Sequence, residues 1–199
     1  MSVVLIDSPV ANVANIARAL RAAEADLVLS SDASTIASAQ RLVLPGVGSF
    51  AAAMRWLRER EIDAAIHEAV RRGAALLGIC VGHQLLFEES LEMGTTRGLA
   101  ILEGVVRRLE STLPVPQIGW NRVRHENSSL FDGIPDGTPF YFVNSYAAAG
   151  GSAEVATAAY GATFTAAAQK GRVYGVQFHP EKSSTAGLQV LRNFVRLAA

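Results

Sequence analysis

Residues 74–90 constrain the fold of this chain more than any other stretch. An apolar run at residues 74–79 leads into the sequence GICVG at residues 78–82, and apolar positions with helical spacing follow at once. A strand, a tight turn with glycine on both sides of a nucleophile, and a helix together make a nucleophile elbow. The N-terminus of such a helix presents free N–H groups beside Cys80, which favour a thiolate and any oxyanion formed there. The stretch therefore predicts that Cys80 is a reactive thiol at the end of a buried strand.

The first 72 residues alternate between predicted strands and predicted helices. A short apolar run typical of a strand buried in a parallel sheet lies at residues 3–6, and further strands are predicted at residues 26–30 and 41–44. Predicted helices separate them and follow them, at residues 13–23 with Asn12 as the expected N-cap, 33–39, 50–60 and 62–72. This alternation, with short links, predicts parallel strands joined by right-handed crossovers.

A second glycine-containing turn, residues 45–49, follows the predicted strand at 41–44. Its sequence, PGVGS, frees backbone N–H groups to face a ligand, as an oxyanion site requires. A plain connecting turn is the alternative interpretation of the same residues. In a parallel sheet the ligand site lies beyond the carboxyl ends of the strands, where both this turn and Cys80 fall. We therefore expect one crevice to hold both.

The pattern changes after residue 98, where strand signals replace helical ones. Turns rich in Pro, Gly, Asn and Asp separate predicted strands at residues 104–109, 117–125, 139–148, 153–160, 163–169 and 172–178, with a hairpin at Lys170-Gly171. A last helix begins at a serine N-cap in residues 183–184. We expect these strands to add antiparallel partners to the sheet. The predicted fold is a single α/β domain over residues 1–199, a doubly wound mixed sheet flanked by helices.

A thiol nucleophile needs a base, and an imidazole base needs a group that holds its tautomer. His179 and Glu181 fit these roles, because residues i and i+2 of an extended segment face the same side and Pro180 keeps His179 out of the helical region. Both follow the predicted strand at 172–178. A solvated strand end is the alternative for this pair, and a small buried core residue is the alternative for Cys80.

The other histidines are weaker candidates for the base. His67 lies in a charged helix and His125 in a polar stretch. His83 lies one helical turn after Cys80, where it would project along the helix and not over the sulfur. Four histidines and one cysteine show no paired ligand spacing, so we expect no metal site.

Composition limits the partners and the compartment. Lysine plus arginine and aspartate plus glutamate both number 18, so no net field would attract nucleic acid or an anionic membrane. The single cysteine excludes an intrachain disulfide and suits a reducing compartment. No apolar run approaches the roughly 18 residues of a membrane span, and the N-terminus lacks the basic region of a signal peptide. We expect a cytoplasmic protein without a cofactor.

Three motifs together resemble the class I, or triad, glutamine amidotransferases over nearly the whole chain. They are PGVG at residues 45–48, GICVGHQ at 78–84 and FHPE at 178–181, in that family's order and spacing. Within the family the chain is most similar to the glutaminase subunits of imidazole glycerol phosphate synthase, on the sequences QLLFEES at 84–90, GWN at 119–121, YFVNSY at 141–146 and HPEKS at 179–183. The resemblance implies a class I glutamine amidotransferase-like fold and hydrolysis of glutamine to glutamate and ammonia through a Cys80 thioester.

The resemblance also implies roles for individual residues. Cys80, His179 and Glu181 would form the catalytic triad, and N–H groups of Gly48 and Val81 would form the oxyanion hole. Glu92 would bind the ammonium group of glutamine, and Ser145 and Tyr146 would contribute backbone contacts. The full set of residues that would contact glutamine is Val47, Gln84, Glu92, Ser145 and Tyr146.

A partner is implied as well. Ammonia is protonated in neutral water, so its release is useful only if a dry path delivers it to an acceptor. The resemblance implies a heterodimer with a (β/α)8-barrel cyclase subunit that makes imidazole glycerol phosphate and aminoimidazole carboxamide ribotide in histidine biosynthesis. Residues matching positions near the docking face are Asn12, Trp120, Tyr141 and Lys182. A core aromatic is the alternative for Trp120.

Two positions depart from the family pattern. Asn144 stands where the family usually has histidine, and the sequence SPVA at residues 8–11 stands where it has a glycine-rich stretch. Both bear on the contact with the cyclase and on activation, and neither touches the triad. Three other hypotheses stay open: a glutaminase subunit of another synthase such as pyridoxal phosphate synthase, a stand-alone cysteine hydrolase of the dienelactone type, and a non-enzymatic scaffold.

Overall fold

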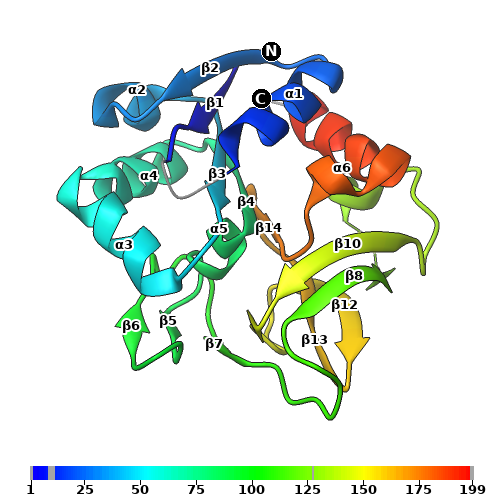
Figure 1. Cartoon of the computed structure of the whole chain (residues 1–199). Helices are drawn as coiled ribbons and strands as arrows, with labels where there is room; N and C mark the ends of the chain where they lie inside the picture. Colours follow the sequence, from blue (N-terminus) through cyan, green and yellow to red (C-terminus); the bar gives the residue numbers. More distant parts are fainter. Residues whose placement is uncertain (1, 9–11, 127, 198–199) are drawn as a thin grey trace.

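The structure is a computed structural model that describes residues 2–8, 12–126 and 128–197. An eight-stranded sheet runs through it, with the strand order β2-β1-β3-β4-β14-β13-β12-β9 (Figure 1). The first five strands in this order are parallel, and the last three are antiparallel to their neighbours. Their bounds are β1 (Ser2–Ile6), β2 (Asp26–Ser30), β3 (Arg41–Gly46), β4 (Ala75–Cys80), β9 (Arg124–His125), β12 (Glu154–Tyr160), β13 (Ala162–Lys170) and β14 (Val173–Val176). The predicted mixed sheet is confirmed.

Helices cover both faces of this sheet. On one side α1 (Val13–Ala22) packs against α6 (Ser184–Arg196), and on the other α4 (Ile62–Arg71) packs against α2 (Ala33–Ser38) and α3 (Phe50–Glu59) (Figure 1). Every residue of β3 and β4 is buried as a result, which explains why these strands are nearly continuous apolar runs. The predicted doubly wound arrangement is confirmed. Among the described residues, no helix is both long enough and apolar enough to cross a membrane.

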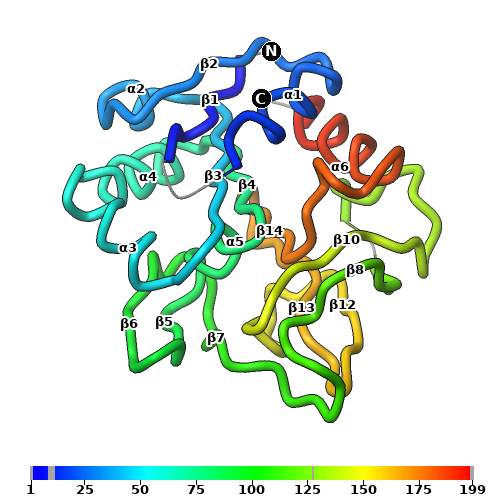
Figure 2. The backbone as a smooth tube through the Cα atoms, viewed as in Figure 1, coloured from blue at the N-terminus to red at the C-terminus, as the bar shows by residue number. Residues whose placement is uncertain are grey.

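Several predicted strands lie outside the central sheet. β8 (Gln117–Arg122) and β10 (Pro139–Asn144) form a two-stranded ribbon. The expectation of single strands at 117–125 and 139–148 is wrong, because the chain leaves the ribbon after Arg122 and after Asn144 to pair elsewhere. In Figure 2 the two strands of the ribbon, β8 and β10, run side by side. A separate small sheet contains β5 (Glu89–Ser90), β6 (Thr96–Arg97), β7 (Val105–Arg108) and β11 (Tyr146–Ala147).

Aromatic packing fixes the ribbon against the segment that carries His179. The rings of Phe140 and Phe142 on β10 lie 4.1 and 5.9 Å from the ring of Phe178, measured between centroids. The Tyr141 carbonyl accepts a 2.8 Å hydrogen bond from the His179 N–H. The position of His179 therefore depends on β10 as well as on β14.

The turns around Cys80 differ from the predicted ones. β3 continues through Pro45 and Gly46, which pairs with Cys80, so the turn is confined to residues 47–49. The expected helix after the elbow is a single turn, α5 (Val81–Gln84). One turn sums few peptide dipoles, so support for a thiolate must come mainly from other groups.

Two expected serine or asparagine caps are not formed. Asn12 occupies the N-cap position of α1 and Ser183 that of α6, but neither side chain makes a capping hydrogen bond among the described residues. Instead the Ser183 hydroxyl donates to the His179 carbonyl and accepts from the Tyr141 N–H, at 2.7 and 2.9 Å. These bonds tie the 3-10 helix η2 (Pro180–Lys182) to β10. A second 3-10 helix, η1 (Ser129–Phe131), contacts α6. The β13–β14 hairpin turns one residue later than predicted, with Gly171 at a φ of +59°.

Candidate active site

Cys80 lies at the tip of a strained strand-to-helix turn. It ends β4 with φ +55° and ψ −112°, a conformation that residues other than glycine rarely adopt and that clusters at functional sites. Close backbone approach explains the flanking glycines. A Cβ on Gly82 would lie 1.9 Å from the Leu44 carbonyl oxygen, and a Cβ on Gly78 would lie 2.5 Å from the Gly82 oxygen. The expected elbow is present, and its glycines make room for β3 and for the turn itself.

His179 pairs with Glu181. Nδ1 of the imidazole lies 2.8 Å from Oε1 of Glu181, and the two side chains are 5% and 1% exposed. The assumption of an extended segment is wrong beyond His179, because residues from Pro180 onward form η2. The other oxygen of Glu181, Oε2, is buried and has no hydrogen-bond partner among the described residues. The imidazole is therefore the group that compensates this carboxylate.

The surroundings of His179 favour the imidazolium. Burial lowers the pKa of an imidazole, but hydrogen bonding to Cys80 and Glu181 and the charge of both outweigh it and raise the pKa of His179 to about 10. At neutral pH the ring therefore carries a proton next to the sulfur. A protonated imidazole beside a thiolate is the pair that acyl transfer to sulfur with release of an amine requires.

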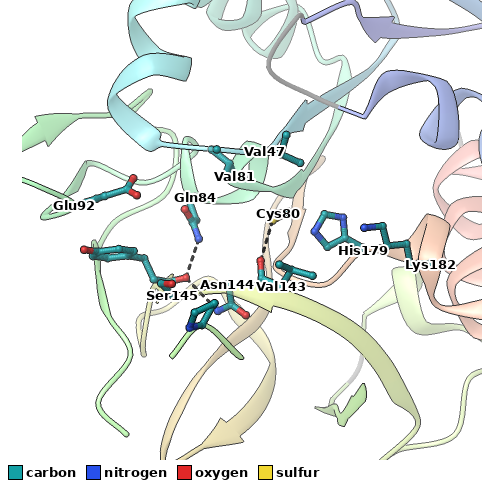
Figure 3. A pocket seen from close by; sticks show the side chains of 13 residues that line it. Val47, Cys80, Val81, Gln84, Glu92, Val143, Asn144, Ser145, His179 and Lys182 are labelled. Atoms are coloured by element: carbon teal, nitrogen blue, oxygen red, sulfur yellow. Dashed lines mark hydrogen bonds between the residues drawn. The ribbon is translucent and has the colours of Figure 1, made fainter. Parts of the chain in front are cut away.

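Cys80 and His179 face one cavity of about 280 Å³, close to the lower end of the usual range for small-molecule pockets (Figure 3). It opens at the carboxyl ends of β3, β4 and β14. Its walls come from distant parts of the chain: Val47, Gly48, Cys80, Val81, Gln84, Glu92, Pro116, Val143, Asn144, Ser145, Tyr146, His179 and Lys182. The structure thus brings together every residue expected at the oxyanion and glutamine sites, and Glu181 contacts His179.

Comparison with known proteins assigns the chain to a family. Residues 4–198 match the family "Glutamine amidotransferase class-I". The chain belongs to this family. It is 45% identical to "Imidazole glycerol phosphate synthase subunit HisH" from Herpetosiphon aurantiacus over 198 residues, which is 98% of this chain and 94% of the relative. The subunit of the same name from Moorella thermoacetica is also 45% identical, with the same coverage of both chains.

Solved structures of low sequence identity share the amidotransferase fold. A crystal structure titled as a glutamine amidotransferase superposes with a TM-score of 0.76 at 19% identity, covering 96% of each chain. PurLQS from Thermotoga maritima gives a TM-score of 0.72 at 19% identity, covering 97% of this chain and 96% of the other. At this identity the similarity shows the fold alone.

In this amidotransferase, Gln84 is fixed by its amide nitrogen. Nε2 donates to the Tyr146 carbonyl at 2.8 Å, the bond that is dashed at Gln84 in Figure 3. It also donates to Oε1 of Gln177 at 2.9 Å, so both of its N–H groups are used. The Tyr146 carbonyl also accepts from Asn144, and the Ser145 carbonyl accepts from a backbone N–H. A carbonyl has two lone pairs, so both acceptor positions of the Tyr146 carbonyl are taken and one position of the Ser145 carbonyl is left for a ligand.

The predicted oxyanion and ammonium groups lie on the cavity wall, and their roles stay predictions. Gly48 adopts a φ of +84° in the exposed 47–49 turn. Val81 is the first residue of α5, so its N–H has no partner within the helix. Glu92 accepts a 2.7 Å hydrogen bond from the N–H of Phe50 at the start of α3, where the helix favours a negative charge.

Three of the predicted interface residues form a continuous group that reaches the cavity through Lys182. We call this group the mouth cluster: Trp120, Tyr141 and Lys182. Trp120 is 55% exposed, so the alternative of a core aromatic is wrong. Its ring meets the Tyr141 ring edge-on at 6.0 Å, and the Lys182 ammonium lies 5.7 Å from the Tyr141 ring centroid. Asn12 is exposed beside α1, which contacts η2. Their interface roles stay predictions.

The two departures from the family pattern have different surroundings. Asn144 is buried and lines the cavity, so it faces the predicted glutamine site and not the outer surface. Ser8 is buried, and residues 9–11 lie outside the described residues.

The remaining histidines lie away from the cavity. His83 is completely buried and packs edge-on against Phe87 at 5.1 Å. Among the residues that the structure describes, neither of its ring nitrogens has a hydrogen-bond partner, so burial lowers its pKa to about 3. It is excluded as the base. His67 is exposed on α4, and His125 stacks on Phe131 at 4.5 Å. Within the part of the chain that is described, no group of three or more His, Cys, Asp or Glu residues could hold a metal ion.

Sequence reasoning missed Gln177. Its side chain is fully buried and bonds to Gln84 on one side and approaches Cys80 on the other. The signal was its position two residues before His179, because alternate residues of an extended segment share a side.

Proposed function

We infer that this chain is the glutaminase subunit of an imidazole glycerol phosphate synthase, which hydrolyses glutamine and passes the ammonia to a cyclase in histidine biosynthesis. One observation carries the chemistry: Cys80, in a strained elbow, shares an amino-acid-sized cavity with His179, whose ring is held by the buried Glu181. Similarity to HisH subunits over nearly the full length supports the choice of acceptor. Membership of the amidotransferase family argues against a dienelactone-type hydrolase and against a scaffold.

The first half of the proposed reaction forms a thioester. The Cys80 thiolate attacks the side-chain carboxamide carbon of glutamine, and the carbonyl oxygen becomes an oxyanion that N–H groups of Gly48 and Val81 would bind. The His179 imidazolium donates its proton to the carboxamide nitrogen as the C–N bond breaks, which releases ammonia. A raised pKa of His179 suits this step because the proton is present before the attack.

The second half hydrolyses the thioester. His179, now neutral, takes a proton from water, whose oxygen attacks the thioester carbon. Collapse of the second oxyanion breaks the C–S bond, releases glutamate and restores the thiolate and imidazolium. Glu181 stabilises the charged ring in both halves.

The substrate would be held by its amino-acid head. We propose that the carboxylate of Glu92 binds the ammonium group and that Oε1 of Gln84, left free by the bonds of its amide nitrogen, accepts a further hydrogen bond. Val47 would close one wall. Backbone N–H groups of Ser145 and Tyr146 would complete the contacts.

The partner and the cellular setting are also proposed. A (β/α)8-barrel cyclase would dock over the mouth cluster and Asn12, where an exposed tryptophan, a tyrosine and a lysine adjoin the cavity. We further propose that residues 1–199 form one type 1 glutamine amidotransferase domain, supported by one shared hydrophobic core. A single cysteine and a reactive thiol suit the cytoplasm.

The test is reconstitution with a cyclase subunit of imidazole glycerol phosphate synthase and its phosphoribulosyl-formimino ribotide. We expect slow glutamate formation by the chain alone and a sharp increase with cyclase and ribotide together, because an oxyanion turn built on glycine can be misaligned until docking. Cys80→Ala should abolish both. Activation by the synthase subunit of pyridoxal phosphate synthase instead would assign a different acceptor, and rapid turnover without a partner would contradict the gating.

A further inference from the structure

The side-chain carboxamide of Gln177 contacts Gln84 through its oxygen and Cys80 through its nitrogen. It follows β14, is 0% exposed, and its backbone N–H donates to the Ala166 carbonyl on β13 at 2.9 Å. Its Oε1 accepts from Nε2 of Gln84 at 2.9 Å, and its Nε2 lies 3.9 Å from Sγ of Cys80. A buried carboxamide with both ends engaged has a defined orientation.

The orientation of the Gln177 carboxamide is set by the Tyr146 carbonyl, which can only accept hydrogen bonds. The Tyr146 carbonyl takes one N–H of Gln84, which therefore turns its nitrogen toward Tyr146 and Gln177. Gln177 must then present its oxygen to Gln84 and its nitrogen to the sulfur. Swapping the two ends would place two nitrogens face to face and leave the sulfur opposite a carbonyl oxygen.

Besides His179, the sulfur has two polar neighbours, and these two favour opposite protonation states of the thiol. The Val143 carbonyl, 3.8 Å from Sγ, accepts a hydrogen bond only from the thiol (Figure 3). The N–H of Gln177 donates to the thiolate. A hydrogen bond to the charged form stabilises that form. Gln177 therefore opposes Val143 in the balance between thiol and thiolate.

We propose that Gln177 is a further catalytic residue that donates a hydrogen bond to the Cys80 thiolate and joins it to Gln84 in the glutamine pocket. The proposal rests on the proposed function for its substrate, but its effect on the sulfur is independent of any substrate. One side chain then holds the nucleophile and orients the residue that would accept from glutamine.

The test compares two replacements with a control. Gln177→Met keeps the length and removes both polar ends, while Gln177→Glu keeps an acceptor for Gln84 and replaces the donor at the sulfur by an oxygen. The control is Gln169→Met on β13, because Gln169 is also bonded at both ends, to Ser128 and to the Gly171 carbonyl, and does not line the cavity. Thermal unfolding of each full-length variant reports whether it is folded.

The first readout is the rate of alkylation by iodoacetamide as a function of pH, which reports on Cys80 alone because the chain has one cysteine. Below the alkaline plateau we expect Gln177→Met and Gln177→Glu to react about threefold to tenfold more slowly than wild type, the range for one lost hydrogen bond. Gln169→Met should follow the wild-type curve. If both Gln177 variants fold and their alkylation rates follow the wild-type pH curve, the proposal is overturned and Gln177 has only a structural role.

The second readout is glutamine hydrolysis with cyclase and ribotide present. Gln177→Glu should lower kcat and leave KM near the wild-type value, because Gln84 keeps its partner, whereas Gln177→Met should change both. If Gln177→Met does not fold, Gln177→Glu decides the outcome by itself. A wild-type chain that fails to hydrolyse glutamine while the alkylation curves still shift would reject the proposed function and keep the role of Gln177 at the sulfur.

Discussion

At the scale of the residue, the partner of a buried group decides its charge. His83 and His179 are both buried, yet the pKa of His83 is lowered to about 3 and that of His179 is raised to about 10. Within the described part of the chain the ring of His83 has no hydrogen-bond partner, so the effect of burial on its pKa is unopposed. His179 has Glu181 at 2.8 Å and Cys80 beside it. Two chemically identical side chains thus become a neutral core residue and a proton donor.

Replacing Glu181 tests this explanation. Glu181→Gln keeps the shape and removes the charge, so we expect the pKa of His179 to fall by more than about one unit. The folded pKa lies above the ordinary 6.5, so the contribution of His179 to the free energy of unfolding is fully present below pH 6.5 and is lost as pH rises toward 10. Titration of the ring nitrogens by NMR measures the shift. Glu61→Gln, at an exposed position, is the control, and an unchanged titration in Glu181→Gln would contradict the assignment.

At the scale of the element, the site depends on how closely β3 approaches the elbow. Leu44 faces Gly82 at a distance that admits no side chain, and Gly46 pairs with Cys80 across the ladder. The strain at Cys80 is held by this packing, because both strands are buried along their whole length. The nucleophile is positioned by the meeting of two strands, and α5 contributes only one turn.

Gly82→Ala should therefore disrupt the elbow. The added Cβ would meet the Leu44 carbonyl oxygen at 1.9 Å, so we expect a loss of more than about 3 kcal/mol in the free energy of unfolding. Gly137→Ala is the control, because its Cβ would meet nothing within 4 Å, and its φ of +76° predicts a loss of only about 1 kcal/mol. Urea denaturation measures both. Equal losses would show that steric approach at Gly82 is not what requires glycine.

At the scale of the whole molecule, the β8–β10 ribbon links the inside of the site to its outside. Phe140 and Phe142 pack on Phe178, while Tyr141 from the same strand joins the exposed mouth cluster. Alternate residues of β10 thus face the core and the surface. A partner that binds the mouth cluster would press on the strand that also holds the backbone of His179.

Trp120→Ala should weaken binding of the cyclase without unfolding the chain. An exposed tryptophan at the centre of an interface contributes on the order of 2 kcal/mol, so we expect roughly a thirtyfold loss of affinity by calorimetry. Stability should change by less than about 0.5 kcal/mol, because the ring is largely exposed. Val28→Ala, on edge strand β2 and 40% exposed, is the control. If Trp120→Ala binds the cyclase with wild-type affinity, the cyclase docks on another face of the chain.

Much of the site was predictable because its signals are local. The GICVG turn and the order of strands and helices needed only glycine spacing and periodicity, and the pairing of His179 with Glu181 needed only two positions in one segment. The route taken by residues 117–125 and 139–148 was not predictable in this way. A strand signal says that a segment is extended, but which strand it joins depends on partners far away in the chain.

The amino-acid sequence by itself determined the elbow at Cys80, the family motifs and the alternation of strands and helices in the first 72 residues, because each is encoded by residues close together in the chain. Only the tertiary structure decided that Gln177 bridges Gln84 and Cys80, that His83 is sealed in the core, and that Trp120 lies on the surface. The physical reason is that burial, hydrogen-bond partners and pKa are set by neighbours in space, and those neighbours can lie far apart in the chain, as Gln177 and Cys80 do at a separation of 97 residues.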